Sequence, residues 1–331
     1  MTSTGSASEG LAVNSVGAQP GNSLQRGVLF SFLATLAWST TGIFIDQLVT
    51  VYHLTPLEIS AWRALLGGAV MGGFLRWRDP ASLQLSRREV PFLALYGVIG
   101  IALFNVVWST SVEVNKAAVA TALIFSAPVF VAIGARLIFK EIIRGIQVAA
   151  IVVNLLGCAL VSGVYDPAAL LQNPAGMLLG LASGLFFGSS TLFGKGAVRL
   201  SYHSSAAITF FIFSFGAIAL LLVGFVLEGL NILFLPLDLW GWLLLIGLSV
   251  GPTLLGYLFF NVSLQYLPAA LVSLLTTMEP PITAILALIF LGRSMNGLQW
   301  LGTGLIVGGV VIMQLVTANF KRSLKKPELS N

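Results

Sequence analysis

The segment KAAVATALIFSAPVFVAIGARLIFK, residues 116–140, recurs as PAALVSLLTTMEPPITAILALIFLG, residues 268–292. At an offset of 152 residues, both copies carry an Ala-Ala pair directly after their first residue, a proline at the same later position, and then Ala-Ile. The match extends into the following segment, where the paired residues are Gly145 with Gly297, Gln147 with Gln299, and Gly157 with Gly309. An internal repeat that contains several apolar segments is typical of duplicated membrane proteins.

The composition places the chain in a membrane. Apolar residues make up 57% of the 331 positions and charged residues only 9%, which is too little charge to cover a soluble globule. A bilayer core about 30 Å thick requires roughly 20 apolar residues per helix. Ten segments meet this requirement: 27–49, 57–75, 90–111, 117–139, 145–163, 175–195, 205–227, 239–264, 269–291 and 297–317. We therefore predict an all-α integral membrane protein with ten transmembrane helices.

The repeat predicts two five-helix units, residues 26–163 and 174–317, around a central cavity. Residues 1–25 are rich in Ser, Gly and Ala, carry one charge, and are predicted to form a disordered tail without the features of a signal peptide. Residues 318–331 form a basic tail.

The positive-inside rule sets the orientation. With a cytoplasmic N-terminus, every Lys and Arg falls on the cytoplasmic side except Lys116, Arg293 and Arg63, and the C-terminus is cytoplasmic too. The second-half loops that correspond to the Arg-rich ones carry Glu228 and Asp238 instead. Because five is an odd number of helices, the second unit is predicted to be inverted relative to the first. The net charge of +5 suits anionic lipid on the inner face of a plasma (inner) membrane.

Several classes of function are disfavoured. The single cysteine, Cys158, gives no disulfide and no cysteine-based metal site, and His53 and His203 stand alone, so no metal or cofactor is expected. No aromatic-basic motif suggests nucleic acid, and no nucleophile–base set suggests an enzyme. The sequence also lacks a phosphate-binding Gly-x-x-x-x-Gly-Lys loop, so transport would be driven by a gradient or by exchange.

Five stretches resemble one known family. They are Ala37-Trp38-Ser39-Thr40-Thr41-Gly42, Phe139-Lys140-Glu141, Leu291-Gly292-Arg293, Tyr266-Leu267-Pro268-Ala269-Ala270 and Glu279-Pro280-Pro281. Together they resemble the ten-helix EamA-type members of the drug/metabolite transporter superfamily, over about residues 26–317. Arg293 departs from the pattern, because members commonly have Glu there.

The resemblance implies a small-molecule carrier, often an exporter of amino acids or related metabolites, whose fifth and tenth helices can form a homodimer face. Exchange of sugar phosphates or nucleotide-sugars is the alternative, although it would require more cationic residues in the cavity than Arg63. A membrane sensor without transport is a weaker alternative.

Glu279 lies near the middle of the ninth predicted helix, where an acid costs about 2.5–3.5 kcal/mol on insertion scales. Either it binds a proton or a substrate amine, or it is permanently paired with Arg63. Pairing is favoured because intramembrane charges usually pair. Arg63 could extend to the interface or capture a carboxylate or phosphate, and Ser60, one turn earlier on the same face, favours the cavity.

Polar and aromatic side chains at matched depths predict the cavity wall. Within helices, Asn105 and Trp108 share one face, as do Tyr257 and Asn261, and Asn105 is paired with Tyr257 by the repeat. The predicted substrate-cavity residues are Trp38, Ser39, Thr40, Arg63, Asn105, Trp108, Tyr257 and Asn261. Alternatively, the hydroxyls bond their own helix carbonyls and the tryptophans anchor at the interface.

Two further roles are predicted. Pro128 and the pair Pro280-Pro281 remove backbone donors near mid-helix, which predicts a matched pair of hinges, with helix packing alone as the alternative. Gly304 and Gly308 lie one turn apart and predict close helix packing rather than phosphate binding.

Overall fold

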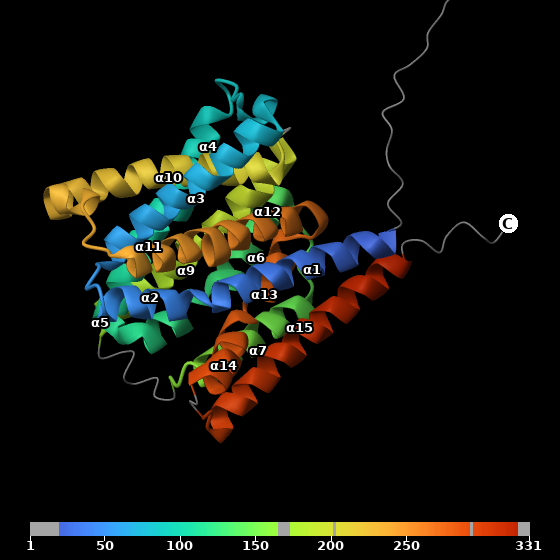
Figure 1. The fold of residues 1–331 in the computed structure, drawn as a ribbon. Coiled ribbons are helices and arrows are strands. Elements are labelled where there is room, and N and C mark those ends of the chain that lie inside the picture. Colours follow the sequence, from blue (N-terminus) through green and yellow to red (C-terminus); the bar gives the residue numbers. More distant parts are fainter. Residues whose placement is uncertain (1–19, 165–172, 201–202, 292–293, 324–331) are drawn as a thin grey trace, which may run out of the picture.

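The computed structural model describes residues 20–164, 173–200, 203–291 and 294–323. Within these ranges all regular structure is helical, and no strand occurs. Residues 1–19 of the predicted N-terminal tail, residues 324–331 of the basic tail, and Arg293 lie outside the described residues. The helices form one bundle, with the N-terminal end of α1 and the C-terminal end of α15 close together at the right of Figure 1.

The first-half elements are α1 Pro20–Ser39, α2 Thr41–Thr50, α3 Pro56–Arg78, η1 Pro80–Leu83, α4 Val90–Gly97, η2 Val98–Leu103, α5 Phe104–Ile124, α6 Ala127–Phe139 and α7 Gly145–Val161. The second-half elements are α9 Pro174–Leu200, α10 Ser205–Glu228, η3 Gly229–Leu233, α11 Leu239–Leu248, η4 Ser249–Leu255, α12 Gly256–Tyr266, α13 Ala269–Thr276, α14 Glu279–Leu291 and α15 Gly297–Ser323. The starts of α6 and α14 are 152 residues apart, as are the starts of α7 and α15.

Seven described segments are long and apolar enough to cross a bilayer, and two shorter apolar ones lie in α7 and α15. These segments account for nine of the ten predicted helices. The tenth, α3, carries Glu58 and Arg63 and is not among them. The protein is an all-helical membrane protein, while the count of ten transmembrane helices stays a prediction.

Two short turns interrupt the helices that carry the repeated prolines. The chain leaves the helix at Phe125–Ser126 and at Thr277–Met278, and Pro128 and Pro280 lie in the first turn of the helix that follows. A proline there costs no hydrogen bond, because the first amides of a helix have no partner within it. Each proline therefore begins a new helix rather than bending a continuous one.

A second matched irregularity precedes the turns. Val98–Leu103 and Ser249–Leu255 are both π-helical, and the repeat offset superposes them. Pro252 lies inside the second segment and accounts for its irregular bonding. Such widened turns rotate the residues that follow, and both lead directly into α5 and α12, where half of the predicted cavity residues lie.

The two halves differ where the third and fourth predicted helices meet. The sequence predicts separate helices over 90–111 and 117–139, and the structure has separate apolar spans at Val90–Asn115 and Val119–Phe139. The helix assigned as α5, Phe104–Ile124, covers the end of one span and the start of the other. Its contacts reverse along α9, because Phe104 packs on Phe187, Asn115 donates to the carbonyl of Gly176, and Ile124 lies against Gly184. Its second-half counterpart divides into α12 and α13 at Leu267–Pro268. The difference follows from the sequence, because Pro268 cannot continue a helix whereas its counterpart, Lys116, can.

Small residues bring the helices together. Gly176, Gly180, Gly184 and Gly188 recur every four residues along α9 and face α5 and α6. A methyl group on Gly184 would lie 3.1 Å from the carbonyl oxygen of Ile124, at the first helix break. Because apolar burial drives little association in lipid, such close backbone approach supplies the packing. Large side chains such as Leu137 and Val226 point outward.

Close packing of α15 against α7 uses other glycines than those predicted. Gly302 and Gly309 face α7, where Gly302 lies against the backbone of Gly157. No atom lies within 4 Å of the position that a methyl group would take on Gly304 or Gly308. Gly304 and Gly308 therefore contact no other helix of the described bundle, and their role in close helix packing stays a prediction.

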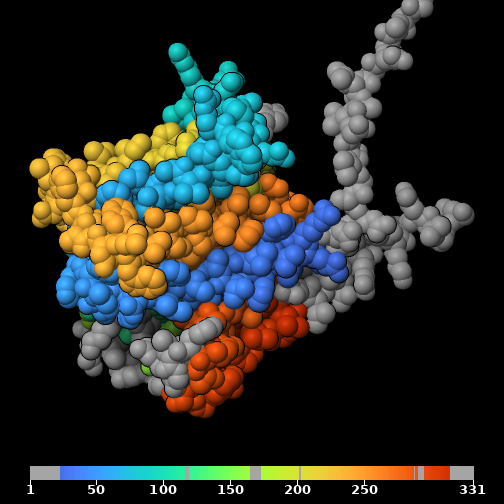
Figure 2. All heavy atoms as spheres, in the orientation of Figure 1, coloured from blue at the N-terminus to red at the C-terminus, as the bar shows by residue number. Residues whose placement is uncertain are grey.

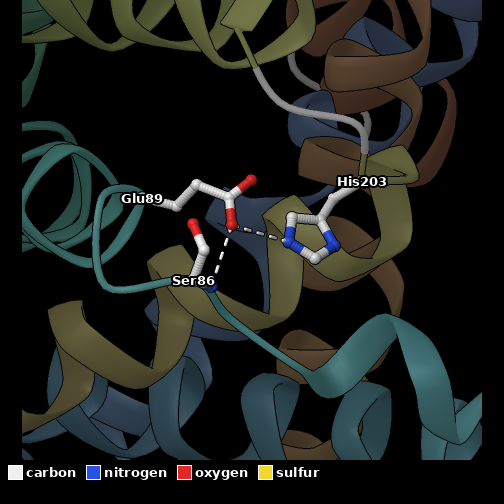
Figure 3. A network of polar contacts seen from close by, with 3 residues as sticks. All are labelled: Ser86, Glu89 and His203. Carbon is white, nitrogen blue, oxygen red and sulfur yellow. Dashed lines mark hydrogen bonds and ion pairs between the residues drawn. The ribbon is translucent and has the colours of Figure 1, made fainter.

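Loop contacts divide the bundle into two ends. At one end, which we call the basic end, the α3–α4, α6–α7 and α9–α10 connections meet. In Figure 3, the Nε2 atom of His203 lies 3.4 Å from the carboxylate of Glu89, which also accepts the amide of Ser86 at 2.9 Å. The pKa of Glu89 lies below its usual range, chiefly because of its hydrogen bonds with Ser86.

The opposite end carries the α2–α3 and α10–α11 connections. The hydroxyl of Tyr52 donates to Asp238 at 2.6 Å, and that of Thr55 donates to Glu228 at 2.9 Å. The hydrogen bond from Tyr52 holds the pKa of Asp238 below its usual range. In Figure 2, α1 and α2 form one blue band that runs across the visible face between these two ends.

The packing of α15 on α7 predicts opposite outcomes for two neighbouring glycines. We expect Gly302→Ala to destabilise the protein by about 1–3 kcal/mol, because its methyl group would lie 2.7 Å from the carbonyl oxygen of Gly157. Gly304→Ala, on the same helix, should not destabilise it. Thermal unfolding of both variants in detergent measures the difference, and equal melting temperatures would contradict this packing.

Candidate functional site

A cavity of about 120 Å³ lies where α1, α3, α5, α9, α12 and α14 converge. It is bounded by both helix breaks, through Phe125 at the first and Glu279 at the second. Its lining residues are Trp38, Thr41, Arg63, Phe104, Trp108, Thr121, Ile124, Phe125, Phe187, Thr253, Tyr257 and Glu279. Both halves of the chain contribute, so the cavity lies between the repeats.

Two opposite charges face this cavity without forming an ion pair. Among the residues that the structure describes, the only pair within 4.0 Å is His203 with Glu89. The predicted pairing of Glu279 with Arg63 is thus not formed in this structure. Tyr257 lines the same cavity and lies within electrostatic range of both charges. The cavity therefore offers separate positive and negative groups to a ligand.

Arg63 is held by polar neighbours on two helices. Its guanidinium donates to Oδ1 of Asn105, which also accepts the hydroxyl of Ser60 at 3.2 Å. The amide of Asn105 donates in turn to the carbonyl of Ile101 at 2.6 Å. Asn105 is 3% exposed and lies behind Arg63 rather than in the cavity wall. The network aims the guanidinium and leaves its remaining donors available to a ligand.

Glu279 occupies the first turn of α14, directly after the Thr277–Met278 break. A negative charge is favourable there, because the amides at a helix N-terminus carry partial positive charge. Within the described ranges, no hydrogen bond to the Glu279 carboxylate is found. The break thus explains how an acid is accommodated at this depth, and it leaves the carboxylate without a fixed partner.

Aromatic rings form the rest of the wall. Trp38 packs edge-on against Phe187 and Tyr257, at centroid distances of 5.8 and 5.4 Å. Phe104 packs against Phe187 at 5.4 Å. Gly256 permits the close approach of Trp38, because a methyl group there would lie 2.4 Å from its indole nitrogen. Rings in such a wall can bind an apolar group or attract a cation through their faces.

Other predicted cavity residues lie elsewhere. The hydroxyls of Ser39 and Thr40 donate to carbonyls of their own helix turn, at 2.7 Å each. Asn261 is fully buried one turn from Tyr257, where it accepts from Tyr96 at 3.3 Å and donates to Thr209 at 3.2 Å. These three residues are not in the cavity lining. Trp38, Arg63, Trp108 and Tyr257 are.

Sequence reasoning missed several lining residues, and one could have been found. The 149-residue offset that pairs Gly27 with Gly176 also pairs Trp38 with Phe187. Thr253 carried no comparable signal, because its direction depends on the π-helical segment around it. Its buried hydroxyl has no partner in the described structure and lines the cavity. An unpaired buried hydroxyl is costly unless a ligand or water satisfies it.

Comparisons with known proteins agree with this architecture. The chain matches the model of the EamA-like transporter family twice, over residues 25–163 and 174–315. It is similar to an "Uncharacterized transporter" of Clostridium kluyveri, with 24% identity over 87% of this chain and 93% of the relative. It is also similar to the "Uncharacterized inner membrane transporter YicL" of Salmonella typhimurium, with 22% identity over 88% of this chain and 96% of that relative. One solved crystal structure shares the fold, with a TM-score of 0.72 and 18% identity over 89% of this chain and 99% of that one.

The network behind Arg63 predicts the effect of removing its acceptor. Asn105→Leu keeps the branched shape and the number of heavy atoms but leaves the donors of Arg63 and Ser60 unpaired, so we expect a loss of about 1–3 kcal/mol in unfolding free energy. Ser189→Ala is the matched control, because that hydroxyl bonds only its own helix, to Leu185 at 2.8 Å. If thermal unfolding in detergent shows equal stability for the two variants, the network does not hold Arg63.

Proposed function

Because the chain belongs to the EamA-like transporter family and is a membrane transporter, we propose that it is a secondary carrier that exports an amino acid or a related small zwitterion by alternating access. We place it in the plasma (inner) membrane with both termini cytoplasmic. The observation that carries the substrate class is the pair of unpaired opposite charges, Arg63 and Glu279, in one cavity.

An amino acid matches both charges. The planar fork of Arg63 suits a carboxylate, which can accept two parallel hydrogen bonds from it. Glu279 suits an ammonium group, and Trp38 and Trp108 can add attraction through their ring faces. A ligand with a single charge would leave one of the two protein charges without a partner in a site of low dielectric. The site therefore favours zwitterions over simple amines or simple carboxylates.

The cavity is small for a metabolite. Its volume of about 120 Å³ corresponds to about four water molecules, below the roughly 300–1,000 Å³ typical of drug-sized ligands. Arg63 is its one cationic lining residue among those described, and an acid lies in the same wall. This combination supports a compact zwitterion over a sugar phosphate or a nucleotide-sugar, which carry several negative charges.

The matched breaks support alternating access. In our proposal the two units, residues 26–163 and 174–317, lie in opposite orientations and rock about the cavity. Pro128 and Pro280-Pro281 follow the turns at which the helix direction can change with few hydrogen bonds broken. Rocking would enlarge the cavity toward one side at a time. Because the cavity lies at the junction of both units, substrate would meet the same residues from either side.

Counterflow tests the substrate class directly. In proteoliposomes preloaded with unlabelled amino acid, we expect uptake of the labelled amino acid without chemical change. Arg63→Gln should reduce uptake at low substrate concentration about tenfold or more, because a hydrogen bond between charged groups is worth about 1.5–3 kcal/mol. Asp46→Asn, at an exposed position, is the matched control. Counterflow of sugar phosphates in place of amino acids would overturn the proposal.

Glu279 is expected to couple transport to protons as well as to bind the amine. With a pH gradient as the only driving force, Glu279→Gln should abolish accumulation above equilibrium, because the amide cannot take up a proton. The measurement is uptake of labelled amino acid with and without the gradient, normalised to protein. Gradient-driven accumulation equal to that of the unsubstituted protein would remove the proton role.

A further inference from the structure

The junction between α12 and α13 is held by two opposite charges from other parts of the chain. Lys195, on α9, donates through Nζ to the carbonyl oxygens of Leu264 and Leu267, at 2.6 and 2.7 Å. On the other side of the break, a carboxylate oxygen of Glu141 accepts the amide of Ala269 at 3.3 Å. Lys195 is buried, with 9% of its surface exposed.

Each charge has the sign that its helix end favours. The last carbonyls of α12 carry partial negative charge and face Lys195, while the first amides of α13 carry partial positive charge and face Glu141. Leu267 and Pro268 are extended, so the backbone groups beside them lack partners within a helix. Two side chains from outside both helices therefore complete the hydrogen bonding of one two-residue break.

The geometry around Glu141 indicates a specific arrangement. Lys140, directly before it, has a φ of 56°, in the left-handed region that residues other than glycine rarely adopt. This conformation ends α6 and directs the Glu141 carboxylate toward α13. The second carboxylate oxygen of Glu141 is buried and has no partner among the described residues. Burial of the Lys195 charge also costs free energy. The junction is therefore held by a strained backbone conformation at Lys140 and by two charged side chains.

The first half has no such junction. Its counterpart, at Asn115–Lys116, is assigned as helix within α5 and has no extended residues. The α12–α13 break is therefore specific to the second half and to the basic end. Apolar contacts also cover it, because Gly27 of α1 lies directly against Leu267 and Phe30 stacks on Tyr266 at 6.4 Å.

The junction joins α12, which carries Tyr257 to the cavity, to α13, which leads through the Thr277–Met278 break to Glu279 at the start of α14. Tyr257 precedes Leu267 by ten residues, about 15 Å along a helix, so the junction lies about half a bilayer from the cavity. We propose that Lys195 and Glu141 are positioning residues that hold the α12–α13 junction closed and keep the cavity shut toward the basic end. If Lys195 and Glu141 released the backbone groups of the junction, α12 and α13 could move relative to each other. This movement would open the cavity toward the basic end. This inference rests on the proposed carrier function, because only a carrier requires a gate at this end.

Cysteine labelling of the cavity tests the gate without any substrate. The reporter is Thr253→Cys in a Cys158→Ala background, treated with a membrane-impermeant maleimide in vesicles that expose either the basic end or the opposite end. We expect Lys195→Met to raise the labelling rate from the basic end about tenfold, the effect of losing about one hydrogen bond to a charged group. Labelling from the opposite end should fall.

Three further variants distinguish opening of the cavity at the basic end from a general destabilisation of the fold. Lys195→Arg retains donors and a charge, so labelling should return toward that of the parent protein. Arg88→Met removes an exposed positive charge from the α3–α4 connection at the same end and should change nothing. Glu141→Gln, at a half-buried position, should shift the rates in the same direction as Lys195→Met and serves as the test if that variant fails to fold.

The direction of the change decides the outcome. If Lys195→Met and Glu141→Gln leave the labelling rates unchanged, or raise them equally from both ends, the two residues only stabilise the fold and the gate is refuted. Labelling is independent of counterflow. If the labelling rates refute the gate but counterflow occurs, the carrier function stands. If counterflow is absent but the variants change labelling from one end only, the carrier function is refuted and the movement of the junction is not.

Discussion

The need to satisfy backbone hydrogen bonds in hydrocarbon is the constraint on which this structure depends. Unpaired amides and carbonyls cost several kcal/mol in lipid, so a helix can break at membrane depth only where protein or a cavity receives its ends. The chain breaks at Phe125–Ser126 and at Thr277–Met278, and both breaks border the cavity or contribute residues to it. Close glycine contacts from α9 cover the first break, and the second places Glu279 at a helix N-terminus.

Duplication followed by divergence explains how two similar halves produce an asymmetric site. The two helices after the breaks begin at equivalent positions, but one begins with Ala127 and the other with Glu279. Likewise the backbone is assigned as helix at Lys116 where it is extended at Pro268. Backbone features shared by the two repeats set the position of the cavity. Side chains that differ between the repeats supply its charge and the polar contacts at one end.

The sequence was sufficient for features that depend on spacing. The repeat offset predicts where helices α6, α7, α14 and α15 begin relative to each other. Features that depend on helix rotation could not be predicted. The π-helical turns redirect Thr253, and the register of α15 turns Gly302 rather than Gly304 toward α7. The burial of Lys195 depends on a helix end that only the fold brings to it.

The opposite orientation of the two halves is the central claim, and site-directed labelling tests it most directly. In a Cys158→Ala background, Gln84→Cys reports on the loop at 79–89 and Asn231→Cys on the loop at 229–238, both at exposed positions. We predict that an impermeant maleimide labels intact cells only at Asn231→Cys, and labels Gln84→Cys only after the membrane is opened. Labelling of both cysteines from the same side would contradict the inverted arrangement.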